Sequence, residues 1–232
     1  MKKHLAALAL AALLPACASA ADLDYRYLDV AFSRGYSNFG TDTTFGPPVV
    51  GGQGYLLDGS FGIGEHWFVE ASYRRNRFHQ EFRSAPVVVV TPKSLRVGGG
   101  FHWAISDRAD FVTHLDLGKA RTDTEVVDFP VASQHEDDHG YVAGVGLRVR
   151  ATDSLEMDLG LDHDNLGFGE QFVTDCRFGA CFLLLQDRQE GAENVVSTAL
   201  RYRFGMWGAG LEYRSSSFQD WRELLLSVRV NF

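Results

Sequence analysis

The last ten residues, ELLLSVRVNF (223–232), alternate between two kinds of side chain. One parity is apolar and consists of Leu224, Leu226, Val228, Val230 and Phe232. The other parity is mainly polar and consists of Glu223, Leu225, Ser227, Arg229 and Asn231. Successive side chains of a β-strand point to opposite faces, so this pattern predicts a strand with one apolar face.

The same alternation recurs along the rest of the chain. It is found near residues 28–33, 56–63, 67–74, 95–103, 111–118, 141–149, 155–162, 196–204 and 209–214. Short turns are expected near residues 64, 106, 152 and 206. Longer links are expected over roughly 37–54, 78–93, 122–138, 164–193 and 215–221. The sequence therefore predicts ten strands, with eight as the alternative, because strand boundaries are uncertain by about two to four residues.

The polar parity of these strands is too charged for the core of a soluble β-sandwich. A barrel in lipid turns its apolar side chains outward and tolerates polar ones in its lumen. Closure also pairs every backbone donor and acceptor that would otherwise face hydrocarbon. We therefore predict an all-β, antiparallel, up-and-down transmembrane β-barrel. Short turns of such barrels are periplasmic, so both termini are expected in the periplasm.

The first twenty residues have the features of an export signal. A basic start (Lys2, Lys3, His4) precedes an apolar run over 5–14 and an Ala18-Ser19-Ala20 cleavage motif. The apolar run is too short to span a bilayer as a helix. The sequence thus predicts a signal peptide over 1–20 and a barrel domain over 21–232. The stretch ending at Cys17 also resembles a lipobox, which leaves lipidation as an alternative.

Charge and cysteine content narrow the classes of partner. Without Lys2 and Lys3, 20 of the 22 basic residues remain against 30 acidic ones, a net charge of −10. A chain this acidic is not suited to nucleic acid. The expected mature chain has two cysteines, Cys176 and Cys181, which we predict form a disulfide after export; free thiols or a metal site are the alternatives.

The export signal, the alternating strands and the terminal Leu226-x-Val228-x-Val230-x-Phe232 together resemble small bacterial outer-membrane barrels of the OmpA-barrel and OmpX type. The resemblance implies a single domain in the outer membrane, with no cofactor and with variable loops. It also implies that Leu226, Val228, Val230 and Phe232 form the signal that the barrel-assembly machinery reads. It does not imply one activity.

A one-sided belt of basic side chains follows from the lipid-facing parity. Beyond the apolar residues, at the expected extracellular end, this parity carries Arg34, Arg75, Lys93, Lys119, Arg121 and Arg222. Lipopolysaccharide phosphates are suitable partners for Arg and Lys, so we predict contact with lipopolysaccharide there. The alternative is a row of solvated strand ends.

The inward parity mixes both signs of charge. The expected lumen network consists of Glu70, Arg74, Arg96, Asp116, Arg148, Glu156, Asp158, Arg201, Glu212 and Arg229. The lumen of a ten-stranded barrel is narrow, so these charges are expected to pair and to plug it. The sequence therefore favours a non-enzymatic barrel that serves envelope integrity or surface interaction, with its surface ligand unknown. A narrow, porin-like passive channel is the alternative.

Two histidine-rich segments raise a less favoured hypothesis, a hydrolase site borne on a loop. Residues 134–139 (QHEDDH) and 162–164 (DHD) place histidine beside carboxylates. A histidine oriented by Asp can act as a general base, as in the ten-stranded omptin proteases that these segments superficially resemble. The chain is short, and no tall strands are expected above the membrane. We therefore predict no catalytic residues and no metal site, with loose binding by His135 and His139 as the alternative.

Overall fold

A computed structural model describes residues 23, 25–37, 50–80, 88–126, 134–166, 171–177, 180–186, 192–216 and 221–232. The predicted signal peptide lies outside these residues. Within them, no helix has the length and apolar character needed to cross a membrane. The described residues contain the twelve strands β1 (Tyr27–Ser37), β2 (Val50–Ile63), β3 (Trp67–Gln80), β4 (Val88–Ser106), β5 (Ala109–Val126), β6 (Gln134–Arg150), β7 (Leu155–Asp164), β8 (Gln171–Arg177), β9 (Ala180–Gln186), β10 (Glu193–Phe204), β11 (Trp207–Ser216) and β12 (Trp221–Asn231).

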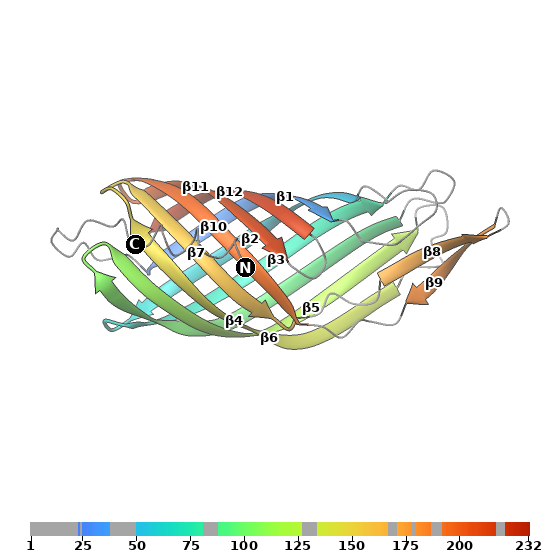
Figure 1. The fold of residues 1–232 in the computed structure, drawn as a ribbon, viewed down its shortest axis with the longest axis horizontal. Coiled ribbons are helices and arrows are strands. Elements are labelled where there is room, and N and C mark those ends of the chain that lie inside the picture. Colours follow the sequence, from blue (N-terminus) through green and yellow to red (C-terminus); the bar gives the residue numbers. More distant parts are fainter. Residues whose placement is uncertain are drawn as a thin grey trace, which may run out of the picture.

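Ten of these strands close into one antiparallel barrel (Figure 1). The order around it is β1-β12-β11-β10-β7-β6-β5-β4-β3-β2, and β8 pairs with β9 in a separate two-stranded sheet. The prediction of a ten-stranded up-and-down barrel is therefore confirmed, and the eight-stranded alternative is wrong. The strands β8 and β9 lie within residues 164–193, for which the sequence predicts only a link.

The first and last barrel strands close the cylinder in one continuous register. Asp29 lies opposite Arg229, and Val30 lies opposite Val228. Outward side chains remain about half exposed, such as Phe32 at 55% and Val228 at 52%, whereas the inward Glu223 and Arg229 are buried. The period of two thus separates an apolar outer surface from a charged lumen, as the membrane requires.

The two ends of the barrel differ in their connections. Tight turns join β2 to β3, β4 to β5, β6 to β7 and β10 to β11, and we call this the short-turn end. Gly64 and Gly205 both adopt a φ of 67° in these turns, a conformation that glycine adopts without steric cost. The opposite end is the long-link end, toward which β4, β5 and β6 extend and where β8 and β9 lie (Figure 1).

The expectation of no tall strands is wrong. The strands β4, β5 and β6 contain 19, 18 and 17 residues, against about 9 to 11 needed to cross a bilayer. Apolar alternation reveals only the part of a strand that faces lipid. Above that part, β-branched residues such as Thr122 and Thr124 continue the pairing with inward side chains, so the predicted links over 78–93 and 122–138 are largely strand.

Candidate functional site

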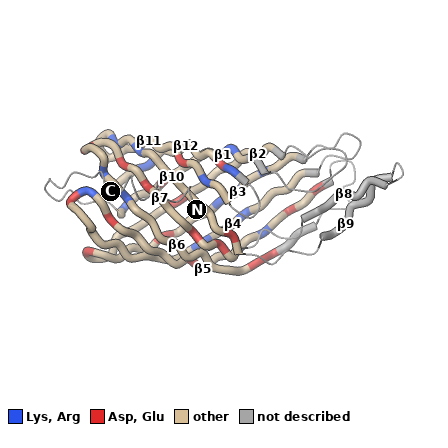
Figure 2. The backbone as a smooth tube through the Cα atoms, in the orientation of Figure 1, with Lys and Arg blue, Asp and Glu red and all other residues tan. Residues whose placement is uncertain are grey.

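The charged lumen is the part of the structure with the most distinctive chemistry. It contains a cavity of about 240 Å³. Acidic and basic residues occur along the barrel strands (Figure 2). The cavity is lined by one histidine, His114, by the seven acidic residues Asp29, Asp58, Glu70, Asp116, Asp158, Asp162 and Glu212, and by the five arginines Arg96, Arg148, Arg201, Arg214 and Arg229.

One network of ion pairs is centred on Arg201 of β10. Its guanidinium contacts Asp158 on the adjacent β7 and lies 3.9 Å from both Asp29 on β1 and Glu212 on β11. Arg229 Nε donates a hydrogen bond to Asp29 Oδ2 over 3.1 Å. Because β1 and β10 are separated by two strands in the barrel, this network joins parts of the wall that backbone hydrogen bonds do not connect.

A second network lies nearer the short-turn end, around Glu156 on β7. Arg148 Nη2 donates to Glu156 Oε2 over 2.9 Å, and Arg203 Nη1 lies 3.4 Å from Glu156 Oε1. Arg150 Nη2 is 3.9 Å from the same oxygen. Glu156 is only 4% exposed, so one buried carboxylate balances three guanidiniums from two neighbouring strands.

Toward the long-link end, a third group connects β3 to β12 across β2 and β1. Arg74 forms an ion pair with Glu223, and Asn76 Nδ2 donates to Glu223 Oε1 over 3.1 Å. Ser33 Oγ in turn donates to Asn76 Oδ1 over 2.9 Å. Farther around the barrel, Arg96 Nη2 lies 2.5 Å from Asp164 Oδ2.

The short-turn end is filled by residues that precede β1. Leu23 and Tyr25 are buried and pack against Phe68 of β3. The Tyr25 ring stacks on His102 at 3.9 Å between centroids, and its hydroxyl donates to Asp110 Oδ2 over 3.0 Å. The chain therefore passes through this end of the lumen before it enters the wall, and we call Leu23 and Tyr25 the N-terminal plug.

The structure brings every predicted member of the lumen network to the inner face, in several separate groups. Arg148 pairs with Glu156, and Arg201 links Asp158 to Glu212. Glu70, Arg74, Arg96 and Arg229 pair with residues outside the predicted set. Of these partners, Asp29 and Glu223 already belong to the inward charges expected from the sequence, whereas Asp164 and His114 are residues that sequence reasoning missed. All four have the inward parity, which could have identified the two that were missed.

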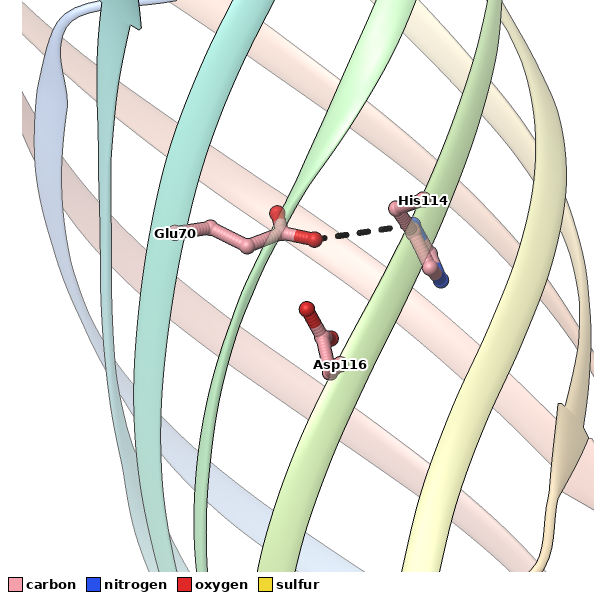
Figure 3. Close-up of side chains that lie close together, drawn as sticks. All are labelled: Glu70, His114 and Asp116. Atoms are coloured by element: carbon pink, nitrogen blue, oxygen red, sulfur yellow. Dashed lines mark ion pairs between the residues drawn. The ribbon is translucent and has the colours of Figure 1, made fainter.

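A compact cluster of three side chains protrudes into the lumen (Figure 3). Glu70 comes from β3, and His114 and Asp116 come from β5, with one ligand atom of each lying within 4.8 Å of the others. His114 Nδ1 is 3.7 Å from Glu70 Oε1, and His114 Nε2 is 3.3 Å from Asp162 Oδ1.

The six residues of the predicted basic belt lie on one continuous arc of the outer surface. The arc comprises β12, β1, β2, β3, β4 and β5, and β2 carries none of the six. Arg75 lies opposite Lys93, which lies opposite Arg121. Carboxylates lie close to several of the belt residues: Lys93 Nζ is 2.5 Å from Asp123, Arg121 Nε is 3.0 Å from Asp123, and Lys119 Nζ is 2.8 Å from Asp137. Arg34, Arg75 and Arg222 are exposed.

The histidine-rich segments lie on strands rather than loops. His163 lies on the outer face of β7 and contacts Asn194 at 3.2 Å, while Asp162 and Asp164 turn inward. The interpretation of this segment as a histidine beside orienting carboxylates is therefore wrong, because neighbouring side chains of a strand point to opposite faces. His139 is exposed on β6, and the side chain of His135 lies outside the described residues.

The two cysteines fall within the β8–β9 sheet. Its register places Cys176 directly opposite Cys181. The structure describes the backbone here but not these side chains, so the disulfide stays a prediction.

Glu156 offers a direct test of the network at the short-turn end. Replacing Glu156 with Gln removes the buried carboxylate that Arg148, Arg150 and Arg203 share, so we expect the free energy of unfolding to fall by about 3 to 5 kcal/mol. Asp153→Asn is the matched control, because Asp153 is exposed and lies 3.7 Å from Arg108 at the same end. Urea unfolding in detergent micelles, followed by tryptophan fluorescence, measures both. Equal stability of the two variants would contradict the network.

This architecture is found in a known family of proteins. The model of the outer membrane protein beta-barrel domain family matches residues 6–214. A comparison with curated proteins finds none that matches the chain.

Similar solved structures include the transport unit of the autotransporter AIDA-I from Escherichia coli, at 9% identity and a TM-score of 0.51, covering 100% of this chain and 98% of that one. Ail, the attachment invasion locus protein of Yersinia pestis, matches at 12% identity and a TM-score of 0.39, covering 89% and 99% of the two chains. An outer membrane channel from Pseudomonas putida F1 matches at 8% identity and a TM-score of 0.43, covering 94% and 100%.

At such identities, structural likeness speaks for the fold alone. The family match covers most of the chain and confirms the resemblance to small bacterial outer-membrane barrels. The chain therefore belongs to the outer membrane protein beta-barrel family, and it is a protein of the bacterial outer membrane.

Proposed function

We propose that this protein is a non-enzymatic outer-membrane barrel with a closed lumen, which serves envelope integrity or surface interaction through its long-link end. The proposal is supported by the packing of the N-terminal plug against Phe68 at the short-turn end, together with ion pairs between non-adjacent strands. Both features stabilise a rigid wall. Neither arranges a nucleophile and a base together on an accessible surface.

Many charged side chains are buried in the narrow lumen of the barrel. The interior of a small barrel is just wide enough for side chains to fill. A charge there that loses its partner costs several kcal/mol, so opening a path through the ion pairs is expensive. The ion pairs are therefore expected to resist widening of the lumen, and the N-terminal plug is expected to close its short-turn end.

The orientation supports a role at the cell surface. Short turns of outer-membrane barrels face the periplasm and longer loops face outward, so both termini are expected in the periplasm. The tall strands β4, β5 and β6 would then extend beyond the outer leaflet, next to the links that could contact other surfaces.

A passive channel is the second candidate, and the cavity of about 240 Å³ favours it. Tyr25 and Phe68 line the cavity, so displacement of the N-terminal plug would open it toward the short-turn end.

Planar-bilayer conductance of the refolded protein separates the two candidates. We expect no discrete openings from the wild type, because the N-terminal plug closes the short-turn end of the path. The double variant Leu23→Ala, Tyr25→Ala should produce openings, whereas the lipid-facing control Leu28→Ala should remain silent. Discrete openings of the wild type would support the channel instead, and a silent double variant would show that the plug is not the barrier.

We also infer that the basic belt contacts lipopolysaccharide. The support is the confinement of all six residues to one arc at one end of the barrel. Like charges directly opposite each other, such as Arg75 and Lys93, are unfavourable without nearby anions. Asp123 and Asp137 supply two carboxylates, and phosphates of the outer leaflet would supply more.

The belt is tested by the rise in melting temperature that added lipopolysaccharide causes in detergent. Replacing Arg75, Lys93, Lys119 and Arg121 with Gln should reduce this rise, because four cations are lost. Asp123→Asn should increase it, since Lys93 and Arg121 lose a competing carboxylate. Arg108→Gln, at the short-turn end, is the control and should change nothing. An undiminished rise in the fourfold variant would count against the contact.

Three further proposals concern export and assembly. Residues 1–20 are the export signal, supported by the cleavage motif at Ala18-Ser19-Ala20. Cys176 and Cys181 form a disulfide, supported by their opposite positions in the β8–β9 register. The outward residues Leu226, Val228, Val230 and Phe232 act as the signal for the assembly machinery, supported by the exposure of Leu226, Val228 and Phe232.

A further inference from the structure

A cluster of carboxylates and one imidazole lies on the inner face of the barrel, where residues of neighbouring strands face each other in register. Glu70 of β3 lies opposite Gly98 of β4, which lies opposite Asp116 of β5. Likewise, His114 of β5 lies opposite Gly144 of β6, which lies opposite Asp162 of β7. In each of these two rows, side chains from two strands meet over a glycine on the strand between them.

The two glycines leave the space that the cluster needs. A Cβ at position 98 would overlap Asp116 Oδ1 and the backbone oxygen of Leu115. A Cβ at position 144 would overlap Asp162 Oδ1 and the imidazole of His114. The missing side chains at Gly98 and Gly144 thus leave two neighbouring spaces on the inner face of the wall. The side chains of Asp116, His114 and Asp162 occupy these spaces.

The cluster lacks enough positive charge of its own. Asp116 is only 8% exposed, and its Oδ1 is a buried atom that accepts no hydrogen bond from any described residue; the same holds for Glu70 Oε1. One imidazole faces the three carboxylates of Glu70, Asp116 and Asp162. The guanidinium of Arg96 is engaged by Asp164 at 2.5 Å. Adjacent buried carboxylates repel each other unless a cation or a proton lies between them.

We propose that Glu70, His114 and Asp116 bind a divalent transition-metal cation within the lumen. Imidazole nitrogen and carboxylate oxygen together are the ligand set that suits zinc and its neighbours. One ligand atom of each residue already lies within 4.8 Å of the others, and a tetrahedral zinc site requires about 3.3 Å. Rotation of the long Glu70 side chain can supply much of that difference.

Asp162 completes the arrangement as a positioning residue. His114 Nδ1 faces Glu70, while Nε2 lies 3.3 Å from Asp162 Oδ1. With the metal on Nδ1, a small reorientation of the ring would let the Nε2–H group donate to Asp162. A ligating histidine commonly donates its other N–H to a carboxylate in this way, which fixes the ring and raises its basicity. The adjacent cavity leaves room for water at the remaining coordination position.

The bound cation would connect β3 to β5 across β4 and offset the acidic excess of the cavity lining. This role is separate from the obstruction of the lumen by the N-terminal plug. This metal site could not be predicted from the sequence, because Glu70 and His114 are 44 positions apart in the chain and become neighbours only when the barrel closes.

The test is a zinc titration of the refolded, chelator-treated barrel, prepared without a histidine tag and measured by isothermal calorimetry in detergent. We expect one saturable site. His114→Asn and Asp116→Asn should each weaken its affinity at least tenfold, and Asp162→Asn should weaken it about 10- to 100-fold. His102→Asn and His139→Asn are matched controls, because His102 pairs with Asp110 at 3.2 Å and His139 lies on the outer surface.

Two results would overturn the proposal. Absence of saturable zinc binding by the wild type would mean that a proton, and not a metal ion, offsets the repulsion between the carboxylates of the cluster. Undiminished binding by His114→Asn and Asp116→Asn would assign the metal to other residues. Should both variants fail to fold, X-ray absorption of the zinc-loaded wild type still decides, since the proposal requires one imidazole ligand among oxygens and is contradicted by two or more imidazoles.

Discussion

The closure of β1 onto β12 is the constraint on which the rest of the structure depends. In hydrocarbon, an unpaired backbone N–H or C=O costs several kcal/mol, so a sheet can cross the membrane only when it has no free edge. Here the first and last strands pair from Tyr27 opposite Asn231 to Ser37 opposite Trp221. The backbone N–H of Phe232 extends the closure by donating to Arg26 O over 3.1 Å.

Closure determines where the charges go. Once the outer face meets lipid, every charged residue of opposite parity is confined to a narrow cylinder. Such charges are tolerated only when they are paired, and the three ion-pair networks meet that requirement with arginine, whose guanidinium can bind several carboxylates at once. The networks around Arg201 and Glu223 connect non-adjacent strands, so they also stiffen the wall beyond what backbone pairing provides.

The sequence predicted the features that depend on a period of two, namely the faces of the strands, the number of barrel strands and the short turns. It could not predict the partners across the lumen. Which inward residues meet depends on the stagger of strands around the closed barrel, a property of the whole sheet rather than of any segment. Glu70 and Asp116 illustrate this, because each is inward by parity but they meet only through the register on both sides of Gly98.

Other features escaped prediction for local reasons. Leu23 and Tyr25 precede the first alternating segment, and nothing in their spacing shows that they enter the lumen. The upper parts of β4, β5 and β6 no longer face lipid, so the apolar parity that marks a strand in the membrane disappears while the pairing continues. The outward position of His163 was readable from its parity, yet its proximity in sequence to Asp162 and Asp164 suggested a site that the strand geometry separates.

Nuclear Overhauser contacts between β1 and β12, measured on isotope-labelled protein in lipid nanodiscs, show whether the barrel is closed. A closed barrel requires cross-strand contacts between the backbone protons of Asp29 and Arg229 and of Val30 and Val228. A register shifted by one residue would turn Arg229 and Asp29 toward opposite faces. That result, or the absence of any contact between the two strands, would contradict the sealed barrel.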